Sequence, residues 1–220
     1  MTDVPRLLLL TDRHVAGTAG HTLQDAVAAA LAGGVRAVLG RDKDLPRATR
    51  ARLLAPVADR CRDAGARFLV ASDPTLAVEL GADGLHLAAA DPPAPATAPG
   101  QLGPLDLVGR SCHDAAELVR ARRDGVTYAT VSPFAPTATK PGYGPPLGSA
   151  GLGRLVAVAG DLPLLALGGI DATNAAAATA AGAHGVAVLG AVLRAHDPTA
   201  ATAALRVALS DDVHPPEPIP

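Results

Sequence analysis

Residues 164–190 read LLALGGIDATNAAAATAAGAHGVAVLG, and this stretch decides the fold class. Its two ends, Leu164–Leu167 and Gly185–Leu189, are short apolar runs without strict alternation, which is typical of strands buried on both faces. Between them lies the alanine-rich stretch Ala172–Ala181, which favours a helix. The pattern therefore predicts two parallel strands joined by a crossover helix.

The same alternation of apolar and alanine-rich segments extends along the whole chain. We expect strands at Arg6–Thr11, Arg36–Gly40, Arg67–Ala71, Gly84–Leu87, Leu105–Arg110, Thr127–Val131, Leu164–Leu167 and Gly185–Leu189. We expect helices at Thr22–Ala32, Ala48–Ala64, Thr75–Leu80, Asp114–Arg123, Leu152–Ala159, Ala172–Ala181 and Thr199–Leu209. Eight such units close naturally into a single (β/α)8 TIM barrel of the α/β class, over residues 1–211, with a flexible tail at 212–220. An open doubly wound sheet is the alternative.

The composition limits the classes of partner. The chain has 220 residues, of which 49% are hydrophobic, so one large domain can bury a sizeable core. Aromatic residues make up 2% and the net charge is −2, so we expect no nucleic acid partner. The sequence contains no apolar window of about 20 residues and no full signal peptide, so we expect no membrane partner and a cytoplasmic location. A homo-oligomer is compatible with the sequence.

A proline- and glycine-rich loop, Ser132–Gly148, directly follows the sixth predicted strand. Thr137 and Thr139 offer hydroxyl donors and Lys140 offers a point positive charge, which together suit a phosphorylated ligand. Loops of this length in compact domains are usually functional or disordered. We predict that Pro141–Pro145 forms a lid. A connector with incidental polar residues is the alternative.

The residues after the predicted strands point to a site at one end of the barrel, because barrel chemistry lies where strands meet the following loops. Arg41 and Lys43 are cations that follow the second strand. Asp73 and Asp91 follow the third and fourth strands, and two carboxylates with phosphate oxygens suit Mg²⁺. Glycines after the seventh and eighth strands let backbone N–H groups approach a phosphate.

Each of these residues also has a plainer interpretation. Asp73 precedes a proline and is a natural helix N-cap, and the turn around Arg41 can lie at a solvated surface. His86 lies between two leucines, which is typical of a hydrogen-bonded core histidine. His113 precedes an alanine-rich helix and can serve as part of its cap. Their joint placement at strand ends is what favours function.

Taken in chain order, the motifs form a distinctive set. They are Arg41-Asp42-Lys43, Ser72-Asp73, Ala82-Asp83-Gly84-Leu85-His86-Leu87 with Asp91, Gly109-Arg110-Ser111-Cys112-His113, Thr137-Ala138-Thr139-Lys140, Pro163-Leu164-Leu165-Ala166-Leu167-Gly168-Gly169-Ile170 and Gly182-Ala183-His184-Gly185-Val186-Ala187-Val188. This ordered set runs through nearly the whole barrel and resembles the thiamine phosphate synthase and thiazole tautomerase family.

The resemblance implies a transferase of thiamine biosynthesis that condenses hydroxymethylpyrimidine diphosphate with thiazole phosphate and releases diphosphate. It implies small phosphorylated pyrimidine and thiazole substrates, with Mg²⁺ as cofactor. The implied catalytic residues are Arg41, Lys43, Lys140, Ser111 and His113. The implied substrate-binding residues are Leu39, Ser72, Thr137, Thr139, Gly169, Leu189 and Gly190, and the implied metal ligands are Asp73 and Asp91.

The sequence departs from the family pattern mainly around the pyrimidine. Leu39, Ser72, Ala89 and Gly190 stand where the family has Gln, Asn, Gln and Ser. The segment around His113 also resembles the tautomerase branch, which aromatises a thiazole carboxylate phosphate without a metal. In that alternative His113 is the proton-transfer residue. A non-catalytic barrel that binds a phosphorylated ligand is a further alternative.

Overall fold

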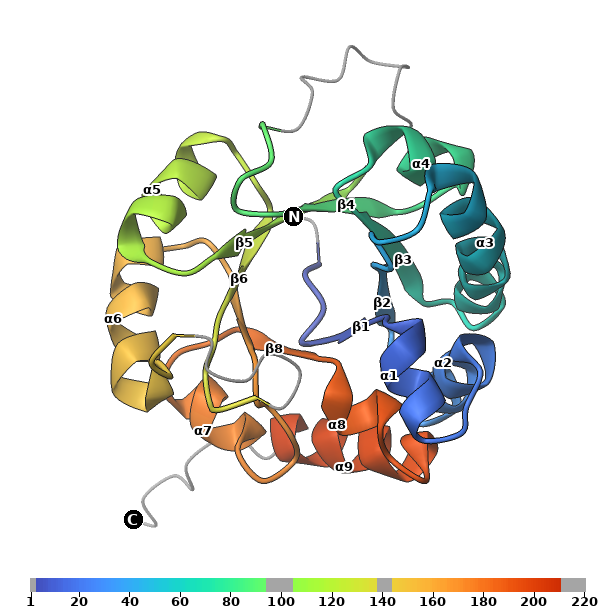
Figure 1. The fold of residues 1–220 in the computed structure, drawn as a ribbon. Coiled ribbons are helices and arrows are strands. Elements are labelled where there is room, and N and C mark those ends of the chain that lie inside the picture. Colours follow the sequence, from blue (N-terminus) through green and yellow to red (C-terminus); the bar gives the residue numbers. More distant parts are fainter. Residues whose placement is uncertain (1–2, 94–104, 138–143, 211–220) are drawn as a thin grey trace.

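The computed structural model of the protein describes residues 3–93, 105–137 and 144–210. Eight parallel strands form a closed barrel, in which each strand pairs with the next along the chain and β8 pairs with β1 (Figure 1). The strands are β1 (Leu7–Leu10), β2 (Ala37–Gly40), β3 (Arg67–Ala71), β4 (Gly84–Leu87), β5 (Leu107–Cys112), β6 (Tyr128–Val131), β7 (Leu164–Leu167) and β8 (Gly185–Val188). The predicted TIM barrel is confirmed, and the open doubly wound sheet is wrong.

Helices surround the barrel as an outer layer (Figure 1). Those that match a predicted helix are α2 (Leu23–Ala32), α3 (Arg47–Asp63), α4 (Pro74–Glu79), α5 (Ala115–Arg123), α6 (Gly148–Ala159), α7 (Ala175–Ala180) and α9 (Pro198–Ser210). Two short helices were not predicted, α1 (Arg13–Thr18) and α8 (Gly190–Leu193). Both directly follow a strand, β1 and β8, at positions where we had expected loops. The predicted tail at 212–220 lies outside the described residues and stays a prediction.

The fifth strand was predicted to end too early. Its ladder with β6 continues to the pairs of Ser111 with Thr130 and of Cys112 with Val131. Ser111 and Cys112 therefore belong to β5, although they had been expected to follow it. This difference matters for the site, because a residue inside a strand has a side-chain direction fixed by the ladder.

The apolar runs lack alternation because both faces of each strand are buried. In β1, Leu8 and Leu10 pack inside the barrel, whereas Leu7 and Leu9 pack between the barrel and the helices. Leu39, Leu69, Leu107, Tyr128 and Leu165 also belong to the inner cluster. The barrel interior is thus a packed core, and a ligand must bind at one of its ends.

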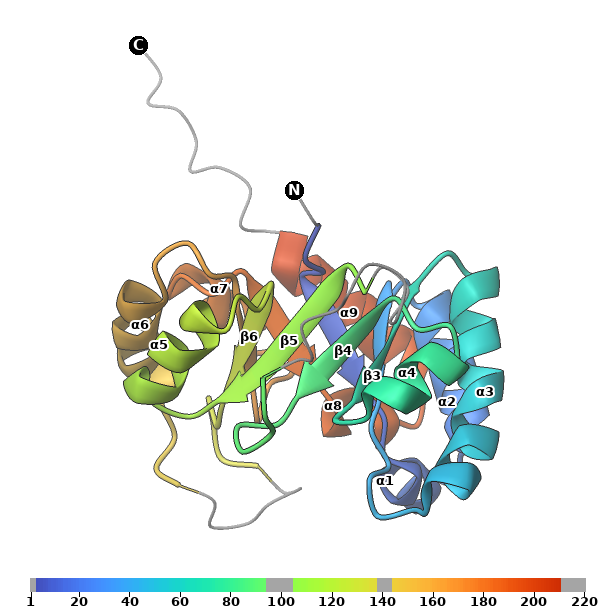
Figure 2. The ribbon, with the colours of Figure 1, turned by 90° about the horizontal axis from the view of Figure 1, so that it is seen from above.

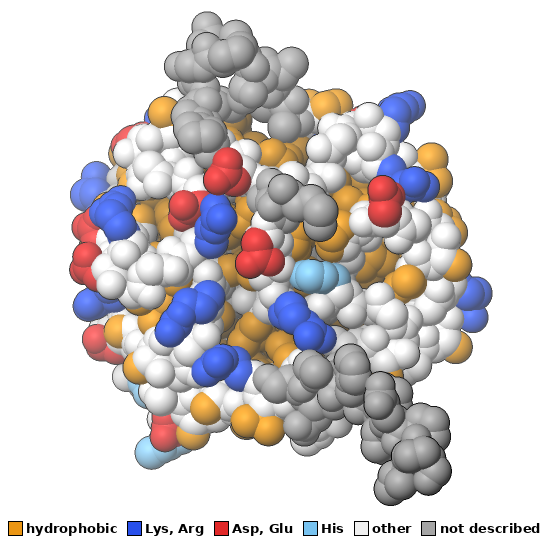
Figure 3. Space-filling model, turned by 180° about the vertical axis from the view of Figure 1, so that it is seen from behind, with side chains coloured by type: hydrophobic (Ala, Val, Ile, Leu, Met, Phe, Trp, Pro, Cys, Tyr) orange, Lys and Arg blue, Asp and Glu red, His pale blue; other side chains and the backbone are white. Residues whose placement is uncertain are grey.

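Figure 2 shows that additional segments project from one end of the barrel. The carboxyl ends of the strands face the lower edge of that view, where α1 and the described part of the loop after β6 project from the barrel. Figure 1 looks onto this face. The opposite face, in Figure 3, carries acidic and basic side chains that are interspersed with one another. None of the helices in the described ranges has both the length and the apolar character that crossing a membrane requires.

Candidate active site

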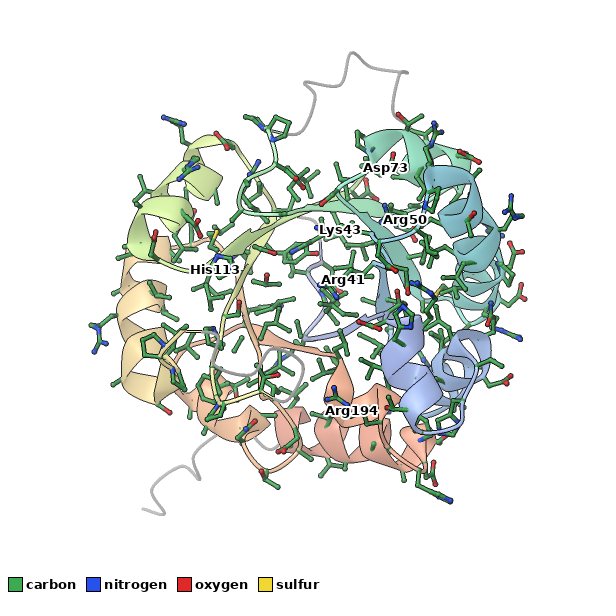
Figure 4. All side chains as sticks on the ribbon, in the orientation of Figure 1. Arg41, Lys43, Arg50, Asp73, His113 and Arg194 are labelled. Atoms are coloured by element: carbon green, nitrogen blue, oxygen red, sulfur yellow. The ribbon has the colours of Figure 1, made fainter. Side chains whose placement is uncertain are left out.

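A cavity of about 570 Å³ opens at the carboxyl ends of the strands. Figure 4 shows Arg41 over the middle of the barrel, with Lys43, His113 and Arg194 around it. The predicted site residues that line the cavity are Leu39, Arg41, Lys43, Ser72, Ser111, His113, Thr137, Gly169, Leu189 and Gly190. These residues come from the ends of β2, β3, β5, β7 and β8 and from the loop after β6, so one site gathers segments from most of the chain.

The turn after β2 is held in a strained shape that presents its two cations to the cavity. Asp42 is buried, has a φ of 26°, and accepts a hydrogen bond from the Thr11 hydroxyl at 2.8 Å. The Thr11 hydroxyl oxygen in turn accepts from the backbone N–H of Arg41, also at 2.8 Å. With Asp42 fixed inward, Arg41 and Lys43 line the cavity on either side of it. The plainer expectation of a wholly solvated turn is therefore wrong for Asp42.

The turn after β3 meets the turn after β2 across the cavity wall. The ammonium group of Lys43 lies 3.3 Å from the hydroxyl oxygen of Ser72, to which it donates. Ser72 has a φ of 59°, a left-handed conformation that costs energy for a residue other than glycine or asparagine. A strained backbone thus holds a hydroxyl next to an ammonium, as a site for an anion requires.

The two candidate metal ligands, Asp73 and Asp91, do not line the cavity itself. Asp73 is the N-cap of α4, and its Oδ1 accepts from the backbone N–H of Leu76 at 2.9 Å. Asp91 accepts through Oδ2 from the backbone N–H of Ala88 at 2.7 Å. The N-cap expected for Asp73 is confirmed, while its role as a metal ligand stays a prediction. In each carboxylate the other oxygen takes no part in these backbone hydrogen bonds.

The donor set fits Mg²⁺, which prefers hard oxygen ligands and is usually held by one or two carboxylates with substrate phosphates and water. Within residues 3–93, 105–137 and 144–210, no group of three or more His, Cys, Asp or Glu side chains could hold a metal. Mg²⁺ held by Asp73 and Asp91 would therefore take its remaining ligands from phosphate and water.

Two buried arginines fix the loops that carry these carboxylates. Arg50 in α3 donates to the carbonyl oxygens of Gly40, at 3.2 Å, and Ala71, at 2.6 Å, which joins the ends of β2 and β3. Its Nη1 lies 4.0 Å from Oδ2 of Asp73, and Figure 4 shows both side chains beside β3 and α4. Arg110 in β5 donates to the carbonyl oxygens of Ala88 (3.2 Å), Ala89 (3.4 Å), Asp91 (2.8 Å) and Pro92 (3.0 Å).

His86 lies at the floor of the cavity and connects it to the core. Its Nε2 lies 3.0 Å from the Ser111 hydroxyl, and its Nδ1 lies 3.0 Å from the Tyr128 hydroxyl. Burial, assisted by the positive charge of Lys43, lowers the pKa of His86 to about 3, so the ring is neutral. Burial also raises the pKa of the Tyr128 hydroxyl, which keeps its proton. The expected hydrogen-bonded core histidine is confirmed, and it also lines the cavity.

His113 lies between β5 and the N-cap of α5, and it borders the cavity. Its backbone N–H donates to Glu117 at 2.7 Å, and its Nδ1 lies 3.0 Å from the same carboxylate oxygen. Asp114, not His113, is the N-cap of α5. His113 therefore supports the helix start through Glu117, close to the capping role that the sequence suggested.

The side of the cavity beyond β7 and β8 suits a second anion. Gly168 and Gly169 have φ values of 88° and 67°, and a Cβ on Gly169 would lie 2.5 Å from the carbonyl oxygen of Pro136. Only glycine fits there, because both the left-handed conformation and the close approach exclude a side chain. Thr137 lines the same side, whereas Thr139, Lys140 and residues 141–143 of the predicted lid at Pro141–Pro145 lie outside the described residues.

Comparison with known proteins decides the family. The family model described as thiamine monophosphate synthase matches residues 7–192. A thiamine-phosphate synthase of Roseiflexus castenholzii is 41% identical over 197 residues, which cover 90% of this chain and 85% of that protein. The chain belongs to the thiamine monophosphate synthase family.

Two further relatives of this family are similar over nearly their whole length. A thiamine-phosphate synthase of Methanoculleus marisnigri is 42% identical over 202 residues, with 91% of this chain and 93% of that protein covered. The solved structure of a thiamine phosphate pyrophosphorylase from Pyrococcus furiosus superposes with a TM-score of 0.78 at 26% identity, covering 95% of this chain and 97% of that one. The resemblance to the synthase branch is confirmed.

The sequence did not lead us to two kinds of residue at the site of this protein, a further cation at the cavity and two buried arginines behind it. Arg194 follows α8 and lines the cavity as a cation, but nothing in its sequence neighbourhood marks it. The buried arginines Arg50 and Arg110 were also missed: Arg50 lies in a helix and has no local signal, whereas Arg110 lies inside β5. An arginine within an apolar strand is unusual enough to have indicated a buried polar network.

Proposed function

We propose that the protein is a thiamine-phosphate synthase, which condenses hydroxymethylpyrimidine diphosphate with thiazole phosphate to give thiamine phosphate and diphosphate. The observation that carries the proposal is the cavity at the carboxyl ends of the strands. One side of it holds Arg41, Lys43 and Ser72, and the other side holds Gly169 and Gly190. Two anion-binding sides in one cavity suit two phosphorylated substrates, and the named relatives agree with that function.

The first step breaks the bond between the pyrimidine methylene carbon and the diphosphate oxygen. Both electrons of that bond leave with the diphosphate, and the carbon becomes a cation that the pyrimidine ring stabilises. Arg41, Lys43 and Lys140 are assigned to the diphosphate, where negative charge develops as the bond breaks. Ser72 donates to the same group. Preorganised cations aimed at developing charge are among the largest contributions to catalysis.

The second step forms the new bond without any proton transfer. The lone pair of the thiazole nitrogen attacks the methylene cation, which makes the nitrogen positively charged. Thr137, Thr139 and the backbone N–H groups of Gly169 and Gly190 are assigned to the phosphate of the thiazole, with Leu189 as an apolar contact. These residues hold the nucleophile near the cation, so binding energy is used for orientation.

Mg²⁺ is proposed as the cofactor, with Asp73 and Asp91 as its protein ligands. When bound, it neutralises charge on the departing diphosphate. Arg50 and Arg110 hold the backbone of the two loops in place and thereby position these carboxylates. Ser111 is assigned to the pyrimidine, which the cavity wall formed by Leu39, Ala88 and Ala89 would cover with apolar surface.

The named relatives give no support to a tautomerase or to a non-catalytic binding barrel. In the tautomerase alternative His113 is the proton-transfer residue. Its Nδ1 atom lies 3.0 Å from a carboxylate oxygen of Glu117, which agrees with a structural role. We also propose a cytoplasmic location and a homo-oligomer.

Diphosphate release tests the proposal, because a tautomerase releases none. We expect release when both substrates and Mg²⁺ are present, and a strong loss of rate when Mg²⁺ is removed by a chelator. Wild-type protein that binds both substrates but releases no diphosphate would contradict the proposal.

A further inference from the structure

Three polar side chains form a continuous hydrogen-bonded chain from the barrel core to the cavity. Tyr128, His86 and Ser111 follow one another with 3.0 Å at each step. The tyrosine is fully buried, His86 is 6% exposed, and Ser111 lines the cavity. One end of this hydrogen-bonded series is therefore buried in the core, and the other end lines the cavity.

A glycine in β5 provides the space for these three hydrogen-bonded side chains. His86 pairs with Gly109 across one ladder, and Gly109 pairs with Tyr128 across the next, so the three residues lie side by side. A Cβ on Gly109 would lie 2.2 Å from the Tyr128 ring and 2.5 Å from Nδ1 of His86. Ser111 lies two residues further along β5 and points to the same face. The glycine lets the two rings meet where any other residue would separate them.

The proton positions follow from counting donors. A neutral imidazole has one N–H donor and one acceptor nitrogen. If Tyr128 donates its hydroxyl proton to Nδ1 of His86, then Nε2 carries the ring proton and donates to Ser111. In the opposite tautomer, Nδ1 donates to Tyr128, and the tyrosine proton needs another acceptor. Within the part of the chain that the structure describes, the Tyr128 hydroxyl has no hydrogen-bond partner other than His86. The first arrangement leaves no buried donor unsatisfied, which favours it.

We propose that Tyr128 and His86 are positioning residues that fix the Ser111 hydroxyl as a hydrogen-bond donor toward the cavity, and that this donor selects a substrate ring with an acceptor nitrogen at that point. Because Ser111 accepts from Nε2 of His86, its own proton is directed to the ligand. The identity of the ring rests on the proposed function, in which it is the pyrimidine. A site built to donate rejects a ring that presents C–H or N–H there, since the hydroxyl proton would be left without an acceptor.

The tautomer is measured directly by ¹⁵N NMR of the full chain labelled at its seven histidines. The His86→Gln variant identifies the His86 signals by their loss. We expect an unprotonated Nδ1 and a protonated Nε2 at pH 7. A protonated Nδ1, or a doubly protonated ring, overturns the inference.

Binding of hydroxymethylpyrimidine diphosphate by calorimetry, without the thiazole substrate, tests the effect on recognition. Tyr128→Phe removes the donor to Nδ1, so we expect a Kd about tenfold higher. Ser111→Ala should weaken binding at least as much, and the double variant should bind no more weakly than Ser111→Ala alone. Additive losses in the double variant overturn the inference, because they mean that Tyr128 does not act through Ser111.

A matched control lies on the same strand. Thr130 is buried two residues beyond Tyr128, and its hydroxyl has no hydrogen-bond partner in the described part of the chain. Thr130 pairs with Ser111 in the ladder, but its hydroxyl makes no hydrogen bond to Tyr128, His86 or Ser111. Thr130→Val therefore removes a buried hydroxyl and leaves these three hydrogen-bonded side chains intact, and we expect its Kd to stay within twofold of wild type. A loss equal to that of Tyr128→Phe overturns the inference. Wild-type binding and tautomer without any turnover would contradict the proposed function and leave this inference standing.

Discussion

Replacing Arg110 by methionine should destabilise the fold and loosen the loop that carries Asp91. The guanidinium of Arg110 lies 3.8 Å from Oδ2 of Asp124, and the two side chains are 2% and 8% exposed. Removing one partner of such a buried pair costs about 3–5 kcal/mol. In a domain of this size each kcal/mol lowers the melting temperature by roughly 2–4 °C, so we expect Arg110→Met to lose about 6 °C or more.

A second variant separates the ion pair from the loop. In Arg110→Met/Asp124→Leu both charges are gone, and replacing a buried pair by apolar side chains is often close to neutral. We therefore expect the double variant to recover at least half of the lost melting temperature. The carbonyl oxygens of the loop after β4 remain without their donor in both variants, so both should need more Mg²⁺ for half-maximal turnover.

Scanning calorimetry and a magnesium titration measure the two effects. Arg62→Met is the control, because Arg62 forms an exposed pair with Asp59 in the same helix, and such pairs contribute only about 0–1 kcal/mol. A melting temperature for Arg110→Met within 2 °C of wild type would refute the energetic reasoning. If Arg110→Met needed no more Mg²⁺ than wild type for half-maximal turnover, the claim that Arg110 positions Asp91 would be refuted.

Three further predictions address the site. Asp73→Asn and Asp91→Asn should each lower turnover at least about tenfold, roughly 1.4 kcal/mol of barrier, and unchanged Mg²⁺-dependent rates in both would contradict the metal assignment. Lys140→Ala should severely reduce diphosphate release while His113→Asn has a much smaller effect, and steady-state rates with the reverse order would favour proton transfer as the chemistry. The pKa of His86 is about 3 in the fold against about 6.5 when unfolded, so the unfolded chain binds more protons between these values. The contribution of neutral His86 to the free energy of unfolding should be complete above pH 6.5 and should fall as the pH is lowered toward 3. In urea unfolding, the free energy of unfolding of His86→Gln should therefore change less with pH between these values than that of the wild type.

Much of the fold was predictable because the strands are buried on both faces. Runs such as Leu164–Leu167 stand out as short and wholly apolar, and their bounds match the structure. The ends of strands were less certain. Ser111 and Cys112 are hydrogen-bonded to β6, but their residue types are also common in loops, so β5 had been predicted to end before them.

The site was predictable where a motif and a strand end coincide. Arg41, Lys43 and Gly169 were predicted this way, and all three line the cavity. Arg50 and Arg194 could not be found in the same manner, because each comes from a helix or its end and reaches the strand ends only in three dimensions. Their roles depend on packing between elements, which residue order alone does not encode.

The most direct test of the proposed synthase is the stoichiometry of the coupled reaction. The protein is incubated with hydroxymethylpyrimidine diphosphate, Mg²⁺ and increasing thiazole phosphate, and both products are quantified by chromatography. The mechanism predicts one thiamine phosphate for each diphosphate released, with release that depends on thiazole phosphate. Diphosphate released at the same rate without thiazole phosphate, or without any thiamine phosphate formed, would contradict it.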